Sequence, residues 1–301
     1  MKNLSLLFIF GSALTFALNS SAETLKFESY EPGDHQGIFS GEWKINASKS
    51  KAKFWKSSDS SAPLVVYTPG WGGVDKYLPA FRDIRAKLGD GYHHLFLYHS
   101  KNVELAGRTI SIYQSIRAAK DKGINPSKIV VIGASGGGQE AMHATHQKTA
   151  AALSGGIKID GVIAFYPSCR VSFEDKSFNN AKILIFVGLK DMVAPAVLCK
   201  ELKESHGLSH AEIREYPDAG HSWLFKKRKK KNFQRTWGEC RINIDPAGVW
   251  HGEGFDSKNG IGELVDGMEK KCSSKKNMLT GRVSAVYKDT IEATIDFVKR
   301  L

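Results

Sequence analysis

The chain has little cysteine, and several ligand-binding motifs are missing from it. Four of its 301 residues are cysteines, and no two of them form a C-x-x-C pair, which is the spacing expected of a structural zinc site. No glycine-rich segment ends in G-K-[ST], and none resembles a dinucleotide-binding loop. These absences argue against nucleotide-binding classes that depend on such loops. We therefore expect no metal, no cofactor and no nucleic-acid partner.

Long apolar runs are also scarce, and the one present lies at the N-terminus. Lys2 precedes an apolar segment at residues 4–18, and the small residues Ser20, Ser21 and Ala22 follow it. This order is typical of a secretory signal peptide cleaved after Ala22. The run is short for a membrane span and lacks a basic flank. We therefore predict a signal peptide at residues 1–22 and a periplasmic or secreted chain at 23–301, with no transmembrane anchor.

The four cysteines all lie late in the chain, at Cys169, Cys199, Cys240 and Cys272. An even number of cysteines in an exported chain favours disulfides. Three pairings of four cysteines are open. Cys169–Cys199 and Cys240–Cys272 are favoured because each closes a loop of moderate length.

Apolar, β-branched segments alternate with amphipathic ones along most of the chain. Such alternation predicts an α/β fold with a mainly parallel sheet and helices on both faces. Short alternating segments such as 25–30 and 37–45 indicate edge strands. The expected buried strands are 64–67, 95–98, 128–132, 161–166, 182–187 and 211–216, and the expected helices are 78–88, 103–122, 139–148, 195–206 and 289–301.

Residues 223–288 break this alternation, because they are basic, glycine-rich and poor in long apolar runs. We interpret them as an insertion pinned by Cys240 and Cys272, within one domain. Much of the net charge of +12 lies in one run, Lys226, Lys227, Arg228, Lys229, Lys230 and Lys231. Such a run is most often a solvated loop tip. The alternative is contact with an anionic surface of the cell envelope or with a polyanionic substrate.

A candidate nucleophile stands between an expected strand and an expected helix. The segment Gly133-Ala134-Ser135-Gly136-Gly137 has the pattern G-x-S-x-G directly after strand 128–132. A sharp turn in this place holds a serine hydroxyl above the strand end, close to the positive end of the following helix. The pattern alone is weak, and its strand–turn–helix context gives it weight.

A serine nucleophile needs a base, and the base needs a partner that orients it. Asp191 directly follows strand 182–187, and His221 directly follows strand 211–216. Both positions lie at the carboxyl ends of parallel strands, where ligands of such sheets bind. We predict that His221 takes the proton of Ser135 and that Asp191 orients His221. Asp218 is the rival acid and His251 the rival base.

Acyl transfer also needs hydrogen-bond donors for the developing oxyanion. The backbone N–H of Gly136 is the first candidate, since it follows the nucleophile directly. The second is the backbone N–H of Trp71, in the glycine-rich segment Pro69-Gly70-Trp71-Gly72-Gly73. The Trp71 indole is also a candidate wall of the substrate pocket.

Together these segments resemble the α/β-hydrolase superfamily, and within it the dienelactone-hydrolase-like secreted proteins. The resemblance covers roughly residues 60–225 and the final helix. It rests on residues 67–73, 133–137, 165–169, 188–191 and 219–221. It implies a Ser–Asp–His hydrolase of esters without a cofactor, in which Tyr166 joins Trp71 in contacting a small-molecule or polymer-borne acyl substrate. The namesake enzymes use a cysteine where Ser135 stands, so lactone specificity is not carried over.

These expectations converge on an exported serine hydrolase that cleaves carboxylic esters through an acyl-enzyme on Ser135. A fold of this kind hosts many functions. The alternative is a non-catalytic binding protein of the same fold that uses its basic run to contact anionic envelope components.

Overall fold

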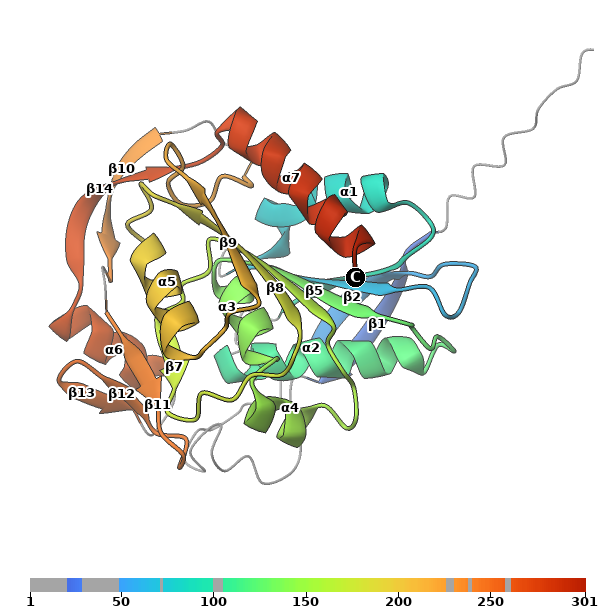
Figure 1. Ribbon diagram of the computed structural model, residues 1–301, viewed down its shortest axis with the longest axis horizontal. Coiled ribbons are helices and arrows are strands. Elements are labelled where there is room, and N and C mark those ends of the chain that lie inside the picture. Colours follow the sequence, from blue (N-terminus) through green and yellow to red (C-terminus); the bar gives the residue numbers. More distant parts are fainter. Residues whose placement is uncertain are drawn as a thin grey trace, which may run out of the picture.

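An eight-stranded sheet forms the centre of the protein (Figure 1). The computed structural model describes residues 21–28, 49–70, 73–99, 105–225, 230–237, 240–257 and 261–301. The strand order is β1-β2-β4-β3-β5-β6-β8-β9. The strands are β1 (Glu23–Glu28), β2 (Lys49–Trp55), β3 (Leu64–Thr68), β4 (His93–Tyr98), β5 (Ile129–Ala134), β6 (Gly161–Phe165), β8 (Lys182–Gly188) and β9 (Ala211–Tyr216). β2 pairs antiparallel with β1 and with β4, and the other pairs are parallel.

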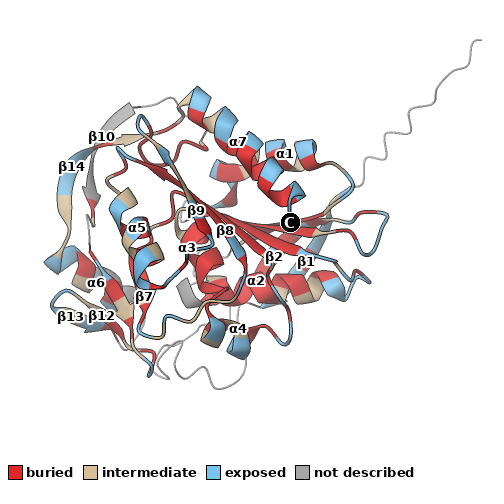
Figure 2. Ribbon diagram, viewed as in Figure 1, coloured by how far each residue is buried: buried red, intermediate tan, exposed pale blue. Residues whose placement is uncertain are grey.

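Helices cover both faces of this sheet, as Figure 1 shows. α1 (Val74–Leu88) and α7 (Ser284–Lys299) pack on one face. The other face carries α2 (Leu105–Lys120), α3 (Gly136–His143), α4 (Gln147–Leu153) and α5 (Ala196–Ser205). Every residue of β3, β5 and β6 is buried for this reason, and Figure 2 shows the central strands as the buried interior. The predicted parallel sheet with helices on both faces is confirmed.

The main sheet and its helices differ from the sequence-based expectation in two places. β2 was not predicted as a strand, although Ser50, Ala52 and Phe54 are buried and the lysines that alternate with them are exposed. The predicted helix 139–148 is two helices, because α3 ends at His143 and the extended backbone of His146 begins α4. The predicted edge strand at 37–45 lies outside the described residues, as does most of the predicted signal peptide. No helix in the described ranges is long and apolar enough to cross a membrane.

The insertion forms small sheets that are attached to the main body. β11 (Ile242–Ile244), β12 (Trp250–Gly252) and β13 (Phe255–Ser257) extend from β7 (Val171–Phe173), which belongs to the main body. β10 (Lys230–Thr236) pairs with β14 (Ser274–Thr280). α6 (Ile261–Lys271) lies between β13 and β14 in sequence. Apolar residues of β7, β11 and α6 share one small core. In the basic run, Lys226 to Lys229 lie outside the described residues, and Lys230 and Lys231 begin β10.

Both favoured disulfides are present. Cys169 pairs with Cys199, and Cys240 pairs with Cys272. The first joins the segment after β6 to α5, and the second joins the residues before β11 to the residue after α6. The predicted pairing is therefore confirmed, and the second bond pins the insertion as expected.

Removing the first disulfide should destabilise the protein. The disulfide joins residues that are 30 positions apart in sequence. Its removal in the Cys169→Ala/Cys199→Ala double variant should lower the free energy of unfolding by about 2–4 kcal/mol, because the unfolded chain regains the entropy that the bond restricts. Denaturant titration of the double variant against the parent measures the loss. Non-reducing peptide mapping that finds four free thiols in the parent would overturn the pairing.

Candidate active site

Ser135 sits on a strained turn between β5 and α3. Its backbone angles are φ 55° and ψ −121°, a conformation that non-glycine residues adopt rarely. The neighbouring glycines allow it. A Cβ on Gly133 would lie 2.2 Å from the Gly137 carbonyl oxygen, and a Cβ on Gly137 would lie 2.4 Å from the Thr68 carbonyl oxygen. The G-x-S-x-G pattern is thus required by the close approach of strand, turn and helix.

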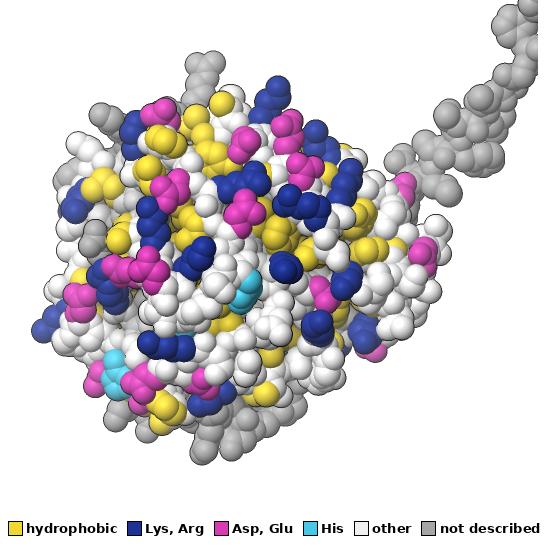
Figure 3. All heavy atoms as spheres, in the orientation of Figure 1, with side chains coloured by type: hydrophobic (Ala, Val, Ile, Leu, Met, Phe, Trp, Pro, Cys, Tyr) yellow, Lys and Arg dark blue, Asp and Glu magenta, His cyan; other side chains and the backbone are white. Residues whose placement is uncertain are grey.

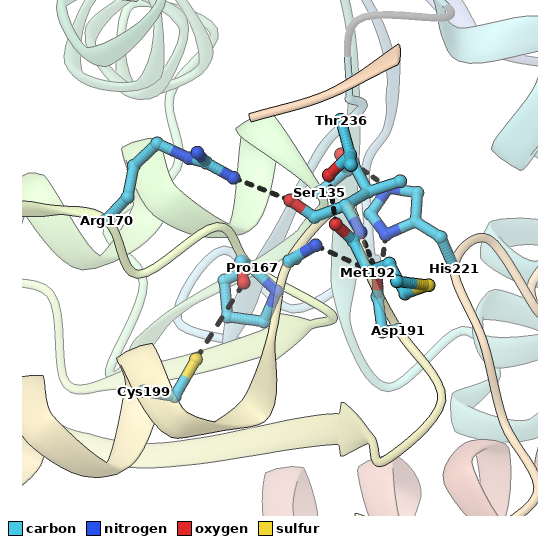
Figure 4. A network of polar contacts seen from close by, with 10 residues as sticks. Ser135, Pro167, Arg170, Asp191, Met192, Cys199, His221 and Thr236 are labelled. Carbon is cyan, nitrogen blue, oxygen red and sulfur yellow. Dashed lines mark hydrogen bonds and ion pairs between the residues drawn. The ribbon is translucent and has the colours of Figure 1, made fainter. Parts of the chain in front are cut away.

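Three side chains predicted from sequence form one hydrogen-bonded relay (Figure 4). The Ser135 Oγ lies 3.1 Å from His221 Nε2, and His221 Nδ1 lies 2.7 Å from Asp191 Oδ2. An ionised carboxylate only accepts hydrogen bonds, so Nδ1–H must donate to Asp191. In a neutral imidazole Nε2 is then unprotonated and accepts the Ser135 O–H. The arrangement is that of a serine prepared for deprotonation.

Asp191 is held firmly in this relay. Its side chain is fully buried, and Oδ1 accepts hydrogen bonds from the backbone N–H groups of Val193 and Ala194, each at 2.8 Å. The Thr236 hydroxyl of β10 donates to the carbonyl of Met192, so the insertion also braces this loop. Only Oδ2 is therefore directed to His221, and the carboxylate orientation is set by the backbone.

The insertion also holds the loop of His221, which the sequence did not reveal. The His221 N–H donates to the Leu279 carbonyl at 2.8 Å, and the Gly281 N–H donates to the His221 carbonyl at 3.0 Å. His221 thereby pairs with Thr280 at the end of β14. On its other side, the Tyr166 ring meets the imidazole edge-on with centroids 4.8 Å apart. The strand thus holds the backbone of His221, and the Tyr166 ring packs against its imidazole.

A cleft of about 330 Å³ opens over Ser135 and His221. Its floor comes from the main body, and one wall comes from the insertion. The main-body residues that line the cleft are Lys76, Tyr77, Ser135, Gly136, Gln139, Ser168, Arg170, Val171, Val193, Ala194, His221 and Ser222. Those of the insertion are Phe225, Trp237, Ile242, Leu264 and Met268. The insertion wall is apolar, whereas several polar groups of the main body face the space near Ser135.

Two buried ionisable groups lie beside this site. Arg170 donates to the Val193 carbonyl, and burial lowers its pKa to about 10 against the opposing charge of Asp191. Glu140 follows the nucleophile on α3, and burial raises its pKa to about 8 despite Arg108 at 3.7 Å. Arg170 thus keeps its charge in the neutral range, whereas Glu140 is largely protonated there.

Of the two predicted oxyanion donors, the structure describes Gly136 and not Trp71. The Gly136 N–H begins α3, directly after Ser135 and beside the cleft. Trp71 lies outside the described residues, so its two predicted roles stay predictions. Tyr166 is fully buried behind His221 and is not among the described residues that line the cleft. Its position is that of a support for the imidazole, in place of the predicted substrate contact.

Neither rival residue joins the relay. Asp218 bonds the exposed Lys190, at 2.6 Å. His251 lies in the insertion, where Nδ1 is 2.8 Å from Asp256 and Nε2 is 3.0 Å from Asp245. In the parts of the chain that the structure describes, no group of three or more His, Cys, Asp or Glu side chains could hold a metal ion.

His251 should make the stability of the insertion depend on pH. Its hydrogen bonds to Asp245 and Asp256 raise its pKa above the usual value. The stabilisation is therefore complete below the unfolded-state pKa of about 6.5 and is lost as pH rises through the higher folded-state pKa. His251→Gln should lower the melting temperature at about pH 5.5 and have a smaller effect at about pH 8.5. Equal effects at both pH values would contradict this assignment.

The comparisons with known proteins gave a match to one family model and to solved structures of similar fold. The model of the dienelactone hydrolase family matches residues 93–240, a segment that contains Ser135, Asp191 and His221. Among curated proteins, none matches the chain. Solved structures with a similar fold include an esterase of Thermogutta terrifontis, which is 18% identical over 65% of this chain and 87% of its own, with a TM-score of 0.48. A proposed dienelactone hydrolase of Klebsiella pneumoniae is 16% identical over 67% of this chain and 88% of its own, with a TM-score of 0.44.

Proposed function

We propose that this chain is a carboxylic ester hydrolase that acts through an acyl-enzyme on Ser135 after export from the cytoplasm, and the match to the dienelactone hydrolase family supports this reaction class. The observation that carries the mechanism is the relay from Ser135 through His221 to Asp191 at the base of the cleft. The family match supports the reaction class, and the geometry of the relay supports Ser135 as the nucleophile, His221 as the base and Asp191 as the group that orients the base.

The reaction follows from the direction of the hydrogen bonds. As the Ser135 Oγ attacks the ester carbonyl carbon, His221 Nε2 accepts its proton, and Asp191 stabilises the imidazolium that forms. When the tetrahedral intermediate collapses, His221 returns the proton to the departing alkoxide, and an alcohol leaves. Water then attacks the acyl-enzyme and gives its proton to His221. The second collapse restores the Ser135 hydroxyl and releases the carboxylic acid.

The cleft favours esters that carry an apolar group. Leu264 and Met268 of α6, together with Ile242 of β11, face the same space as Ser135. An aliphatic chain or ring placed there would exchange water for apolar contact, worth about 25 cal/mol for each Å² buried. We therefore propose aliphatic or aromatic esters as substrates, ahead of amides.

Export is supported by two independent features. The N-terminal pattern is that of a signal peptide, and both cysteine pairs form disulfides, which persist in oxidising compartments. A role for the basic run in binding anionic surfaces stays a proposal. On the face shown in Figure 3, Lys and Arg side chains are interspersed with Asp and Glu side chains, so that face carries no broad field of one sign.

The proposed activity is tested with p-nitrophenyl esters of increasing acyl length and with the matching anilides. We expect ester hydrolysis with an initial burst of p-nitrophenol equal to the enzyme concentration wherever deacylation is slower than acylation, and little anilide cleavage. Intact-mass measurement after rapid acid quenching should show the acyl group on the protein. No ester hydrolysis and no adduct with any member of the series would refute the proposal.

A further inference from the structure

Tyr77 brings a buried hydroxyl to the nucleophile, and none of the roles above uses it. The residue lies in the first turns of α1, directly after the loop that follows β3. Its side chain is 2% exposed, and it lines the cleft next to Ser135 and Gly136. Its hydroxyl lies beside the Ser135 side chain, because a Cβ built on Gly70 would come within 3 Å of both the hydroxyl oxygen and the Ser135 Cβ. The phenol of Tyr77 therefore lies beside the residue that carries the nucleophile, Ser135.

The contacts around Gly70 show where this hydroxyl lies relative to Ser135. A Cβ on Gly70 would lie 2.3 Å from the Tyr77 hydroxyl oxygen and 2.9 Å from the Ser135 Cβ. The hydroxyl therefore occupies the space between Ser135 and the backbone of the loop after β3. In a fold of this type the oxyanion forms between that loop and the N–H of the residue after the nucleophile, which is Gly136 here.

The relay decides which of the two neighbouring hydroxyls can act as a donor. The Ser135 proton is donated to His221 Nε2, so only the Tyr77 hydroxyl has a proton to donate to a group in the cleft. Burial raises the pKa of Tyr77 above its ordinary value, so the phenol keeps its proton throughout the working pH range. A protonated, buried and preorganised donor is what stabilisation of an oxyanion requires.

We propose that the Tyr77 hydroxyl is a catalytic oxyanion donor, which complements the backbone N–H of Gly136. This inference rests on the proposed ester hydrolysis at Ser135. During attack, the carbonyl oxygen of the ester gains negative charge beside the Ser135 Oγ. The Tyr77 O–H donates a charge-assisted hydrogen bond to this oxyanion. The bond is stronger to the charged oxygen of the transition state than to the neutral carbonyl of the bound ester, which is the condition for acceleration.

The test is Tyr77→Phe, which removes the hydroxyl and keeps the ring. We expect kcat for an activated ester to fall about 10²-fold or more, with a much smaller change in KM, as for loss of one oxyanion donor elsewhere. The matched control is Tyr67→Phe. It removes a buried hydroxyl from the same apolar core, where Tyr67 bonds His94 at 3.0 Å, and it should leave kcat within a few-fold.

A second readout separates donation to the oxyanion from a structural effect. Sulfur accepts hydrogen bonds more weakly than oxygen, so the parent should prefer an ester over the matching thionoester, and Tyr77→Phe should reduce that preference. The preference is a ratio of kcat/KM values and does not depend on how much of the preparation is folded. An unchanged ratio, or a kcat within about threefold of the parent, would overturn the inference. If Ser135→Ala abolishes turnover while Tyr77→Phe keeps kcat within about threefold of the parent, only the inference fails.

Discussion

Ser135→Ala is expected to lower kcat for p-nitrophenyl esters by about 10⁶-fold, which is the loss seen when the nucleophile of such a triad is removed. The strained turn at φ 55° holds the hydroxyl against His221 Nε2, and within this relay Ser135 is the only group placed to form the acyl-enzyme. The substitution deletes one oxygen atom at the cleft, so the melting temperature should be close to that of the parent. Residual turnover would come from binding and from the oxyanion donors.

The control for this variant is Ser115→Ala. Ser115 is a buried serine of α2, whose hydroxyl donates to the Ile112 carbonyl. It does not belong to the turn between β5 and α3 that carries Ser135. It should cost some stability and leave kcat per folded enzyme unchanged. A folded Ser135→Ala protein that keeps more than a trace of the parent rate would mean that another group carries the chemistry.

Asp191→Asn is expected to lower kcat by about 10⁴-fold, through the tautomer of His221. Oδ1 of Asp191 accepts two backbone N–H groups, from Val193 and Ala194. An asparagine must keep its carbonyl oxygen there, so its NH₂ group has to face His221 Nδ1. Nδ1 then becomes an acceptor, Nε2 carries the proton, and the imidazole can no longer accept the Ser135 proton. Steady-state kinetics on the folded variant measure the loss.

The matched control for Asp191→Asn is Asp218→Asn, which changes the rival acid in the turn before His221. Asp218 is exposed and bonds Lys190, so kcat should stay within a few-fold of the parent. Equal losses in the two variants, or a large loss in Asp218→Asn alone, would show that the assigned orienting acid is wrong.

Local signals in the sequence were sufficient for the sheet and for the relay. Runs of β-branched residues marked the buried strands, and each candidate of the relay directly followed a strand. Because parallel strands share one carboxyl edge, Ser135, Asp191 and His221 could be expected to meet without knowledge of the contacts. The sequence left three cysteine pairings open and favoured the two bonds that the structure contains, because each closes a loop of moderate length.

The supports of the relay could not be predicted, because they depend on contacts between distant segments. The β14 strand meets His221 about 60 residues further along the chain, and nothing in the composition of residues 223–288 indicates this pairing. Tyr77 lies one residue before the predicted helix 78–88, and no sequence signal assigned it a role. Its neighbourhood to Ser135 depends on how α1 packs above β3 and β5, and on the missing side chain of Gly70.

The most direct test of the account is covalent labelling with a fluorophosphonate probe, followed by peptide mapping. Such a probe reacts with an activated serine hydroxyl and not with ordinary ones. The account predicts one adduct per chain, located on Ser135, which disappears in Ser135→Ala and on heat denaturation and is strongly reduced in Asp191→Asn. A folded parent protein that is not labelled, or that is labelled on a different residue, would contradict the assignment of Ser135 as the nucleophile.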